Sequence, residues 1–83
     1  MSSDRERAQQ ALAELKASVT SYLEGRSEGA TNSEVCQALS LESDFQGDQK
    51  NYLSWSILGL LVNEKKVVYT KVRRSRIYSV VRA

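Results

Sequence analysis

The stretch that decides the fold is residues 67–81, VVYTKVRRSRIYSVV. Two runs within it, residues 67–72 and 76–81, are rich in β-branched residues and tyrosine, and a short polar segment, Arg73-Arg74-Ser75, lies between them. Such runs joined by a short connection predict a β-hairpin. Because an isolated two-stranded hairpin is only marginally stable in water, this one is expected to pack against the rest of the chain.

The residues before the hairpin carry two helix signals. Apolar side chains recur at three- and four-residue steps from Ala8 to Leu23, which predicts a helix over residues 4–24 that stops at Gly25. Farther on, Thr31-Asn32-Ser33-Glu34 matches the capping box and predicts the start of a second helix that ends near Ser40.

A third helix is expected from the N-cap Asp48 to about Glu64. Its predicted core stripe consists of Leu53, Ile57, Leu60 and Leu61. A second apolar stripe, on the opposite side, contains Trp55, Leu58 and Val62 together with Asn51. A helix that is apolar on two sides is either buried on both or presents one of them to a partner. Trp55, Leu58 and Val62 are therefore candidate interface residues, unless the first helix and the hairpin cover Leu58 and Val62 internally.

Length and composition exclude several classes of protein. The 83 residues allow one domain over residues 1–83, with fraying expected over residues 1–7, and the fold class is predicted to be α+β. No apolar run is long enough to span a bilayer, the N-terminus has no apolar signal core, and a single cysteine, Cys36, cannot form an internal disulfide. These features favour an intracellular protein, in the cytoplasm, nucleoid or nucleus.

Catalytic chemistry has little support in the sequence. The chain has no histidine, no paired cysteines and no glycine-rich phosphate loop. We therefore expect no enzyme activity, no cofactor, no metal site and no small-molecule substrate. Cys36 stands in an acidic stretch and is expected to act as a small, partly buried apolar residue rather than a reactive thiol.

Charge is distributed unevenly along the chain. Residues 65–83 contain seven lysines and arginines and no acid, whereas residues 30–64 contain five acids and one lysine. A concentrated cationic segment points to an anionic partner, most often nucleic acid. The alternative is that these cations only protect an exposed strand from aggregation.

The expected order of helix, extended link, two helices and hairpin resembles the winged-helix (winged helix-turn-helix) DNA-binding family. The segments that carry the resemblance are Gly29 to Leu39, Leu60 to Tyr69 and Arg74 to Val80. The first has a polar cap, an acid and then apolar residues, the second leads from the recognition helix into the first strand, and the third is the return strand. The sequence departs from the family where Lys65 and Lys66 stand, because glycine is common there, and in a longer turn over residues 41–47.

The resemblance implies a double-stranded DNA partner and a role in transcription regulation. In the family, the third helix lies in the major groove and the hairpin, or wing, contacts the backbone or the minor groove. The residues that match these positions are Gln49, Lys50, Asn51 and Ser54 on the third helix, and Lys71, Arg73, Arg74 and Arg76 on the wing. Glutamine, asparagine and lysine can bond to base edges, and flexible cations can contact phosphates.

The acidic middle of the chain opposes tight binding by a single copy. Small winged-helix proteins commonly compensate by forming a homodimer or by joining a larger complex. The alternative function is therefore a protein–protein adaptor with a winged-helix fold, for which the second apolar stripe supplies the contact surface.

Overall fold

The computed structural model describes residues 3–42 and 51–81, and it confirms the α+β class. Its elements are α1 (Asp4–Glu24), α2 (Asn32–Ala38), α3 (Tyr52–Asn63), β1 (Val67–Val72) and β2 (Ser75–Val80). Three helices followed by a C-terminal antiparallel hairpin are compatible with winged-helix topology. None of the helices in the described ranges combines the length and the apolar character needed to cross a bilayer.

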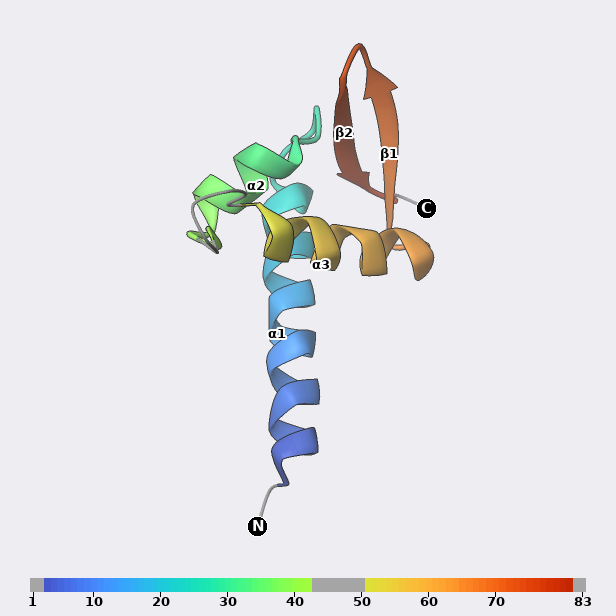
Figure 1. Ribbon diagram of the computed structural model, residues 1–83. Helices are drawn as coiled ribbons and strands as arrows, with labels where there is room; N and C mark the ends of the chain where they lie inside the picture. The colour runs from blue at the N-terminus through green and yellow to red at the C-terminus, as the bar shows by residue number, and fades with distance from the viewer. Residues whose placement is uncertain (1–2, 43–50, 82–83) are drawn as a thin grey trace.

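The long helix α1 has the bounds that the sequence predicts. It is capped by Ser3, whose hydroxyl accepts a hydrogen bond from the Glu6 N–H at 3.1 Å. Its C-terminal half supplies the fully buried Val19 and Leu23, and Leu12 and Leu15 pack against the core from the middle of the helix. The N-terminal end extends away from the other elements (Figure 1). Figure 1 also shows α3 running across α1, with α2 and the hairpin on opposite sides of the α1 C-terminal end.

The predicted capping box opens α2. The Thr31 hydroxyl accepts from the Glu34 N–H at 3.2 Å, and the Thr31 N–H donates to the Glu34 carboxylate at 2.9 Å. The bond from the Thr31 N–H holds the pKa of the Glu34 carboxyl below its ordinary value, because it stabilises the charged form. Val35 and Cys36 are fully buried, so Cys36 is more deeply placed than the partly buried position that the sequence predicts.

The helices α2 and α3 end in the same way, through one left-handed residue, Ser40 (φ 53°) and Lys65 (φ 63°) respectively. After α3, the Lys66 N–H donates to the Leu61 carbonyl and the Lys65 N–H to the Val62 carbonyl, both at 3.0 Å. This pair of bonds is the Schellman motif, in which glycine is the usual left-handed residue. A lysine adopts that conformation at a cost of about 1 kcal/mol.

The helix α3 differs from the prediction in the residue at which it begins and in the face that it buries. It begins at Tyr52, with Asn51 at the N-cap position, whereas the predicted cap Asp48 lies outside the described residues. The predicted core stripe is also wrong in part, because Leu53 and Leu60 are exposed while Ser54 and Leu58 are fully buried. The buried face is thus rotated away from the predicted one, since α3 packs against α1, α2 and β1 at once.

The hairpin is present, with a tighter turn than predicted. Val72 pairs with Ser75, so the loop consists of Arg73 and Arg74 alone, and β2 begins one residue earlier than expected. The paired positions that face the helices are Val67 with Val80 and Tyr69 with Tyr78. Val67 and Tyr78 are buried and close the core from this side.

The link between α1 and α2 pairs with the hairpin. The Ala30 N–H donates to the Tyr78 carbonyl at 2.9 Å, and the Tyr78 N–H donates to the Ala30 carbonyl at 2.8 Å. Gly29, immediately before, has φ 80°, and a Cβ built there would lie 2.5 Å from the Tyr78 carbonyl oxygen. The close approach of the link to β2 therefore requires glycine.

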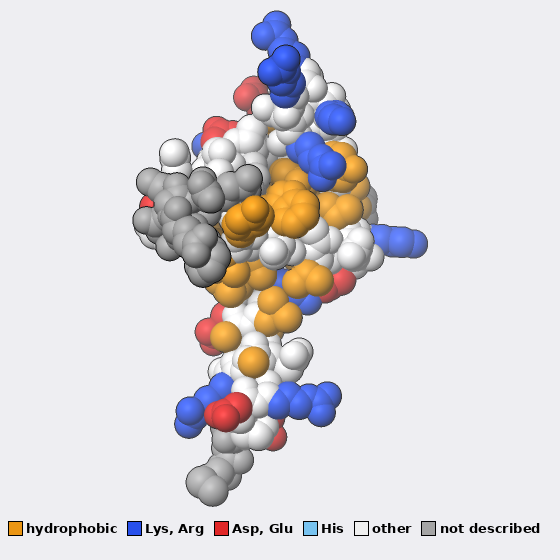
Figure 2. All heavy atoms as spheres, viewed as in Figure 1, with side chains coloured by type: hydrophobic (Ala, Val, Ile, Leu, Met, Phe, Trp, Pro, Cys, Tyr) orange, Lys and Arg blue, Asp and Glu red, His pale blue; other side chains and the backbone are white. Residues whose placement is uncertain are grey.

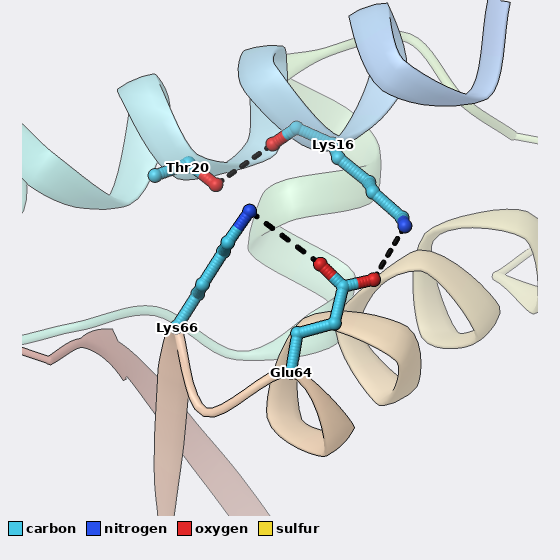
Figure 3. Close-up of polar contacts among 4 residues, drawn as sticks. All are labelled: Lys16, Thr20, Glu64 and Lys66. Atoms are coloured by element: carbon cyan, nitrogen blue, oxygen red, sulfur yellow. Dashed lines mark hydrogen bonds and ion pairs between the residues drawn. The ribbon is translucent and has the colours of Figure 1, made fainter. Parts of the chain in front are cut away.

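One ion-pair cluster joins α1 to the end of α3 (Figure 3). The Glu64 carboxylate accepts a hydrogen bond from the Lys16 ammonium of α1 and lies 3.6 Å from the Lys66 ammonium. The hydrogen bond from Lys16, with the charges of both lysines, lowers the pKa of the Glu64 carboxyl.

Replacing Gly29 by alanine should destabilise the fold. We expect Gly29→Ala to lose about 3 kcal/mol of unfolding free energy, because the new Cβ collides with β2 and the left-handed backbone is strained. Chemical denaturation measures the loss. The control is Gly25→Ala, whose Cβ would have its nearest atom at 3.5 Å, and which should change stability by less than about 0.5 kcal/mol. Equal stabilities of the two variants would contradict this account of the link.

Acid should remove the contribution of Glu64 to stability. Because the pKa of Glu64 is lower in the folded chain than in the unfolded chain, its contribution is complete above the unfolded pKa. The contribution disappears as the pH falls through the folded pKa. We therefore expect the melting temperature of Glu64→Gln to lie below that of the native chain at neutral pH and to converge with it in acid. The control Glu14→Gln changes an exposed α1 glutamate that forms no ion pair within residues 3–42 and 51–81. The difference in melting temperature between this variant and the native chain should not depend on pH in this way.

Candidate nucleic-acid interface

The hairpin places four cations, Lys71, Arg73, Arg74 and Arg76, at its exposed end. Among the described residues, Glu34 forms an ion pair with Arg26, and Glu64 forms ion pairs with Lys16 and Lys66. None of the four hairpin cations has an acidic partner there. Figure 2 shows lysine and arginine side chains gathered over the hairpin end of the molecule. As far as residues 3–42 and 51–81 are concerned, this end can therefore receive an anion without first breaking an ion pair.

The charge on the hairpin is maintained at a cost to stability. Lys71 lies directly opposite Arg76 in the register, and like charges at such positions repel one another. Arg73, the first loop residue, has φ 58°, a conformation in which glycine is the favoured residue. Arg76 gains one compensating contact, because its guanidinium lies 4.6 Å from the centre of the Tyr69 ring.

The α3 residues that were predicted to contact DNA bases are placed less favourably for that role than the hairpin cations are for contacting phosphates. Gln49 and Lys50 lie outside the described residues. The side-chain amide of Asn51 donates to the Ser33 hydroxyl at 3.1 Å. The main-chain carbonyl of Asn51 accepts from the Asn32 side-chain amide at 3.2 Å and lies 3.1 Å from the Ser54 hydroxyl oxygen. Asn51 thus joins the start of α3 to α2, and its side chain is half-buried.

Ser54 does not reach the surface at all. It is fully buried, and its hydroxyl donates to the Asn32 side-chain oxygen at 2.6 Å. The sequence prediction fails here because Ser54 lies on the same face of α3 as Ile57, Leu58 and Leu61, which is the face that meets the core. A contact between Ser54 and DNA is therefore incompatible with this fold.

The exposed face of α3 is aromatic rather than cationic. Tyr52 is 52% exposed and Trp55 is 53% exposed. Of the three candidate interface residues, Trp55 is thus available, Val62 is half-buried, and Leu58 is fully buried inside the domain. Tyr52 was not singled out from the sequence, although its position three residues before Trp55 places both rings on one face.

A hollow of about 520 Å³ lies between this face of α3 and the hairpin. Its walls include Trp55, Gly59 and Val62 from α3, and Tyr69 and Arg76 from the hairpin. Trp55 also borders two smaller hollows, one shared with Arg74 at the hairpin loop and one shared with Tyr52. Figure 2 shows the apolar side chains of this region next to the cations of the hairpin.

Other kinds of site are not assembled in the part of the chain that the structure describes. Within residues 3–42 and 51–81, no three histidine, cysteine, aspartate or glutamate side chains are grouped so that they could hold a metal ion.

The buried hydroxyl of Ser54 should matter for stability. We expect Ser54→Ala to lower the unfolding free energy by about 2 kcal/mol, because the Asn32 oxygen loses its donor in a partly buried position. Ser56→Ala, an exposed change two residues away on the same helix, is the matched control and should have almost no effect. Thermal and chemical denaturation of both variants measure the difference, and a stable Ser54→Ala would contradict the role assigned to this hydroxyl.

Comparison of the chain with protein-family models, with curated proteins and with solved structures gives no match.

Proposed function

We propose that this chain is a winged-helix DNA-binding protein that acts as a small transcriptional regulator. The observation that carries the proposal is the hairpin end, where Lys71, Arg73, Arg74 and Arg76 are exposed and have no acidic partner among the described residues. In this proposal the hairpin contacts backbone phosphates, and α3 lies toward the major groove. The resemblance of the residue pattern to the winged-helix family supports the same function.

The energetics of the hairpin favour a polyanion as the partner. A phosphate between Lys71 and Arg76 would offset the repulsion between these directly opposed cations. Binding to a duplex also releases condensed counterions, and each phosphate that a cation neutralises adds to the salt dependence of the affinity. The face of α3 offers no cation in its described residues, so the proposed affinity depends on the hairpin.

A second candidate function, a protein–protein adaptor, is supported by the rings on α3. Tyr52 and Trp55 are each more than half exposed, and Leu60, farther along α3, is 37% exposed. Large rings of this kind are enriched where one protein contacts another, including the contact between two copies of a chain. An adaptor would lose partner binding on Trp55→Ala and would not respond to removal of the hairpin arginines.

Removal of the loop arginines should weaken binding to duplex DNA. We expect Arg73→Ala/Arg74→Ala to reduce affinity roughly tenfold at physiological salt and to lower the slope of log K against log salt by about two. Fluorescence anisotropy of a labelled duplex over a salt series measures both quantities.

The matched control removes two arginines at the opposite end of the molecule. Arg5→Ala/Arg7→Ala changes the net charge by the same amount, at the α1 end far from the hairpin (Figure 1), and should leave the slope almost unchanged. If both double variants behave like the native chain, the hairpin does not contact DNA and the proposed function is wrong.

A further inference from the structure

We infer that the hollow between α3 and the hairpin binds an unstacked nucleobase, so that the chain binds single-stranded DNA and frayed duplex ends in addition to the intact duplex. We call this hollow, lined by Trp55, Gly59, Tyr69 and Arg76 among others, the ring trough. The inference rests on the proposed function and deepens it, because the strand that supplies the base is the one whose phosphates the hairpin holds.

Gly59 gives the first argument. It is exposed near the middle of α3, where glycine lowers helix stability relative to alanine. A Cβ at this position would have no atom within 4 Å, so packing does not require glycine there, in contrast to Gly29. Because Gly59 lines the ring trough, its missing side chain keeps the floor of the trough open. Glycine at such a position is typical of a surface that another molecule approaches closely.

The rings give the second argument. Trp55 stands on the α3 side of the trough and Tyr69 on the hairpin side, and these residues are 53% and 43% exposed respectively. Tyr69 is held in place by Arg76 on its face and by the Tyr78 ring, whose centre lies 5.7 Å away. Accessible rings beside a cationic path are the arrangement by which proteins stack the bases of a single strand.

The charge of the residues around the trough favours a nucleic acid over the other flat or apolar ligands that could enter it. The residues around the 520 Å³ hollow include Arg76 and no acid. The adjoining hollow of about 270 Å³ adds Arg74, and again no acid lines it. A strand can therefore pass from the hairpin loop toward Trp55 with its phosphates beside arginines and a base against the rings. Inside a duplex, both faces of each base are already stacked, so an intact duplex cannot fill the trough in this way.

The experiment uses Trp55, which is the only tryptophan in the chain and therefore reports on the trough by its fluorescence. The full chain is titrated with a short oligothymidylate, with a strand of the same length made of abasic sugars, and with a duplex of that length. We expect the oligothymidylate to quench the fluorescence. The abasic strand, which has the phosphates but no bases, should bind roughly tenfold more weakly and without quenching.

Gly59→Ala separates binding from stability. The added methyl group should raise the melting temperature by roughly 3 °C, because alanine favours the helix, while it reduces affinity for oligothymidylate about tenfold. Its affinity for the abasic strand should not change. Gly25→Ala, a glycine replacement at the end of α1 and outside the trough, is the matched control and should leave the affinities for both strands unchanged.

The outcomes distinguish this inference from the proposed function. Equal binding of oligothymidylate and the abasic strand, with no quenching, would overturn the inference, and the proposed function would stand if Arg73→Ala/Arg74→Ala still weakens duplex binding. If that double variant changes no affinity, the proposed function fails and the inference fails with it. Self-association that Trp55→Ala abolishes, with no response of Trp55 to any strand, would assign the trough to a second copy and would also overturn the inference.

Discussion

Two backbone hydrogen bonds between Ala30 and Tyr78 connect the hairpin to the helical part of the chain. A two-stranded hairpin has too little buried surface to be stable alone, so its position depends on this pairing and on the burial of Val67 and Tyr78. The pairing in turn requires Gly29, because a side chain there would collide with β2. This pairing, together with the contacts of the hairpin with the three helices, sets where the cationic hairpin lies relative to α3 and therefore the ring trough between them.

Local signals predicted most of the fold. The bounds of α1, the capping box of Thr31 and Glu34, and the hairpin over residues 67–81 each follow from residues that are neighbours in sequence. The errors concern α3, where tertiary contacts decide. Ser54 is buried although it is polar, because the side-chain oxygen of Asn32 of α2, far away in sequence, accepts a hydrogen bond from its hydroxyl. No periodicity of apolar residues contains that information, so the predicted core stripe was rotated from the observed one.

The candidate site, too, has a part that could be predicted from local sequence and a part that depends on tertiary contacts. The cations of the hairpin could be predicted, because a run of lysines and arginines next to a turn is exposed in almost any fold. The ring trough could not be predicted, because it brings Trp55 of α3 together with Tyr69 of β1. The angle between these two elements depends on tertiary contacts and cannot be inferred from the sequence of either one. Only Gly59, an otherwise unfavourable residue inside a predicted helix, was a local signal that the sequence alone offered.

The joint between α3 and β1 determines how this surface responds to a partner. Only Glu64, Lys65 and Lys66 connect the two elements. The Lys66 N–H is bonded back to α3, and its carbonyl accepts from the Val81 N–H at 3.0 Å. These hydrogen bonds on both sides of Lys66 restrict movement of the connection. The two walls are therefore preorganised, little conformational entropy is lost on association, and differences in affinity between partners should arise mainly from how fast each complex dissociates.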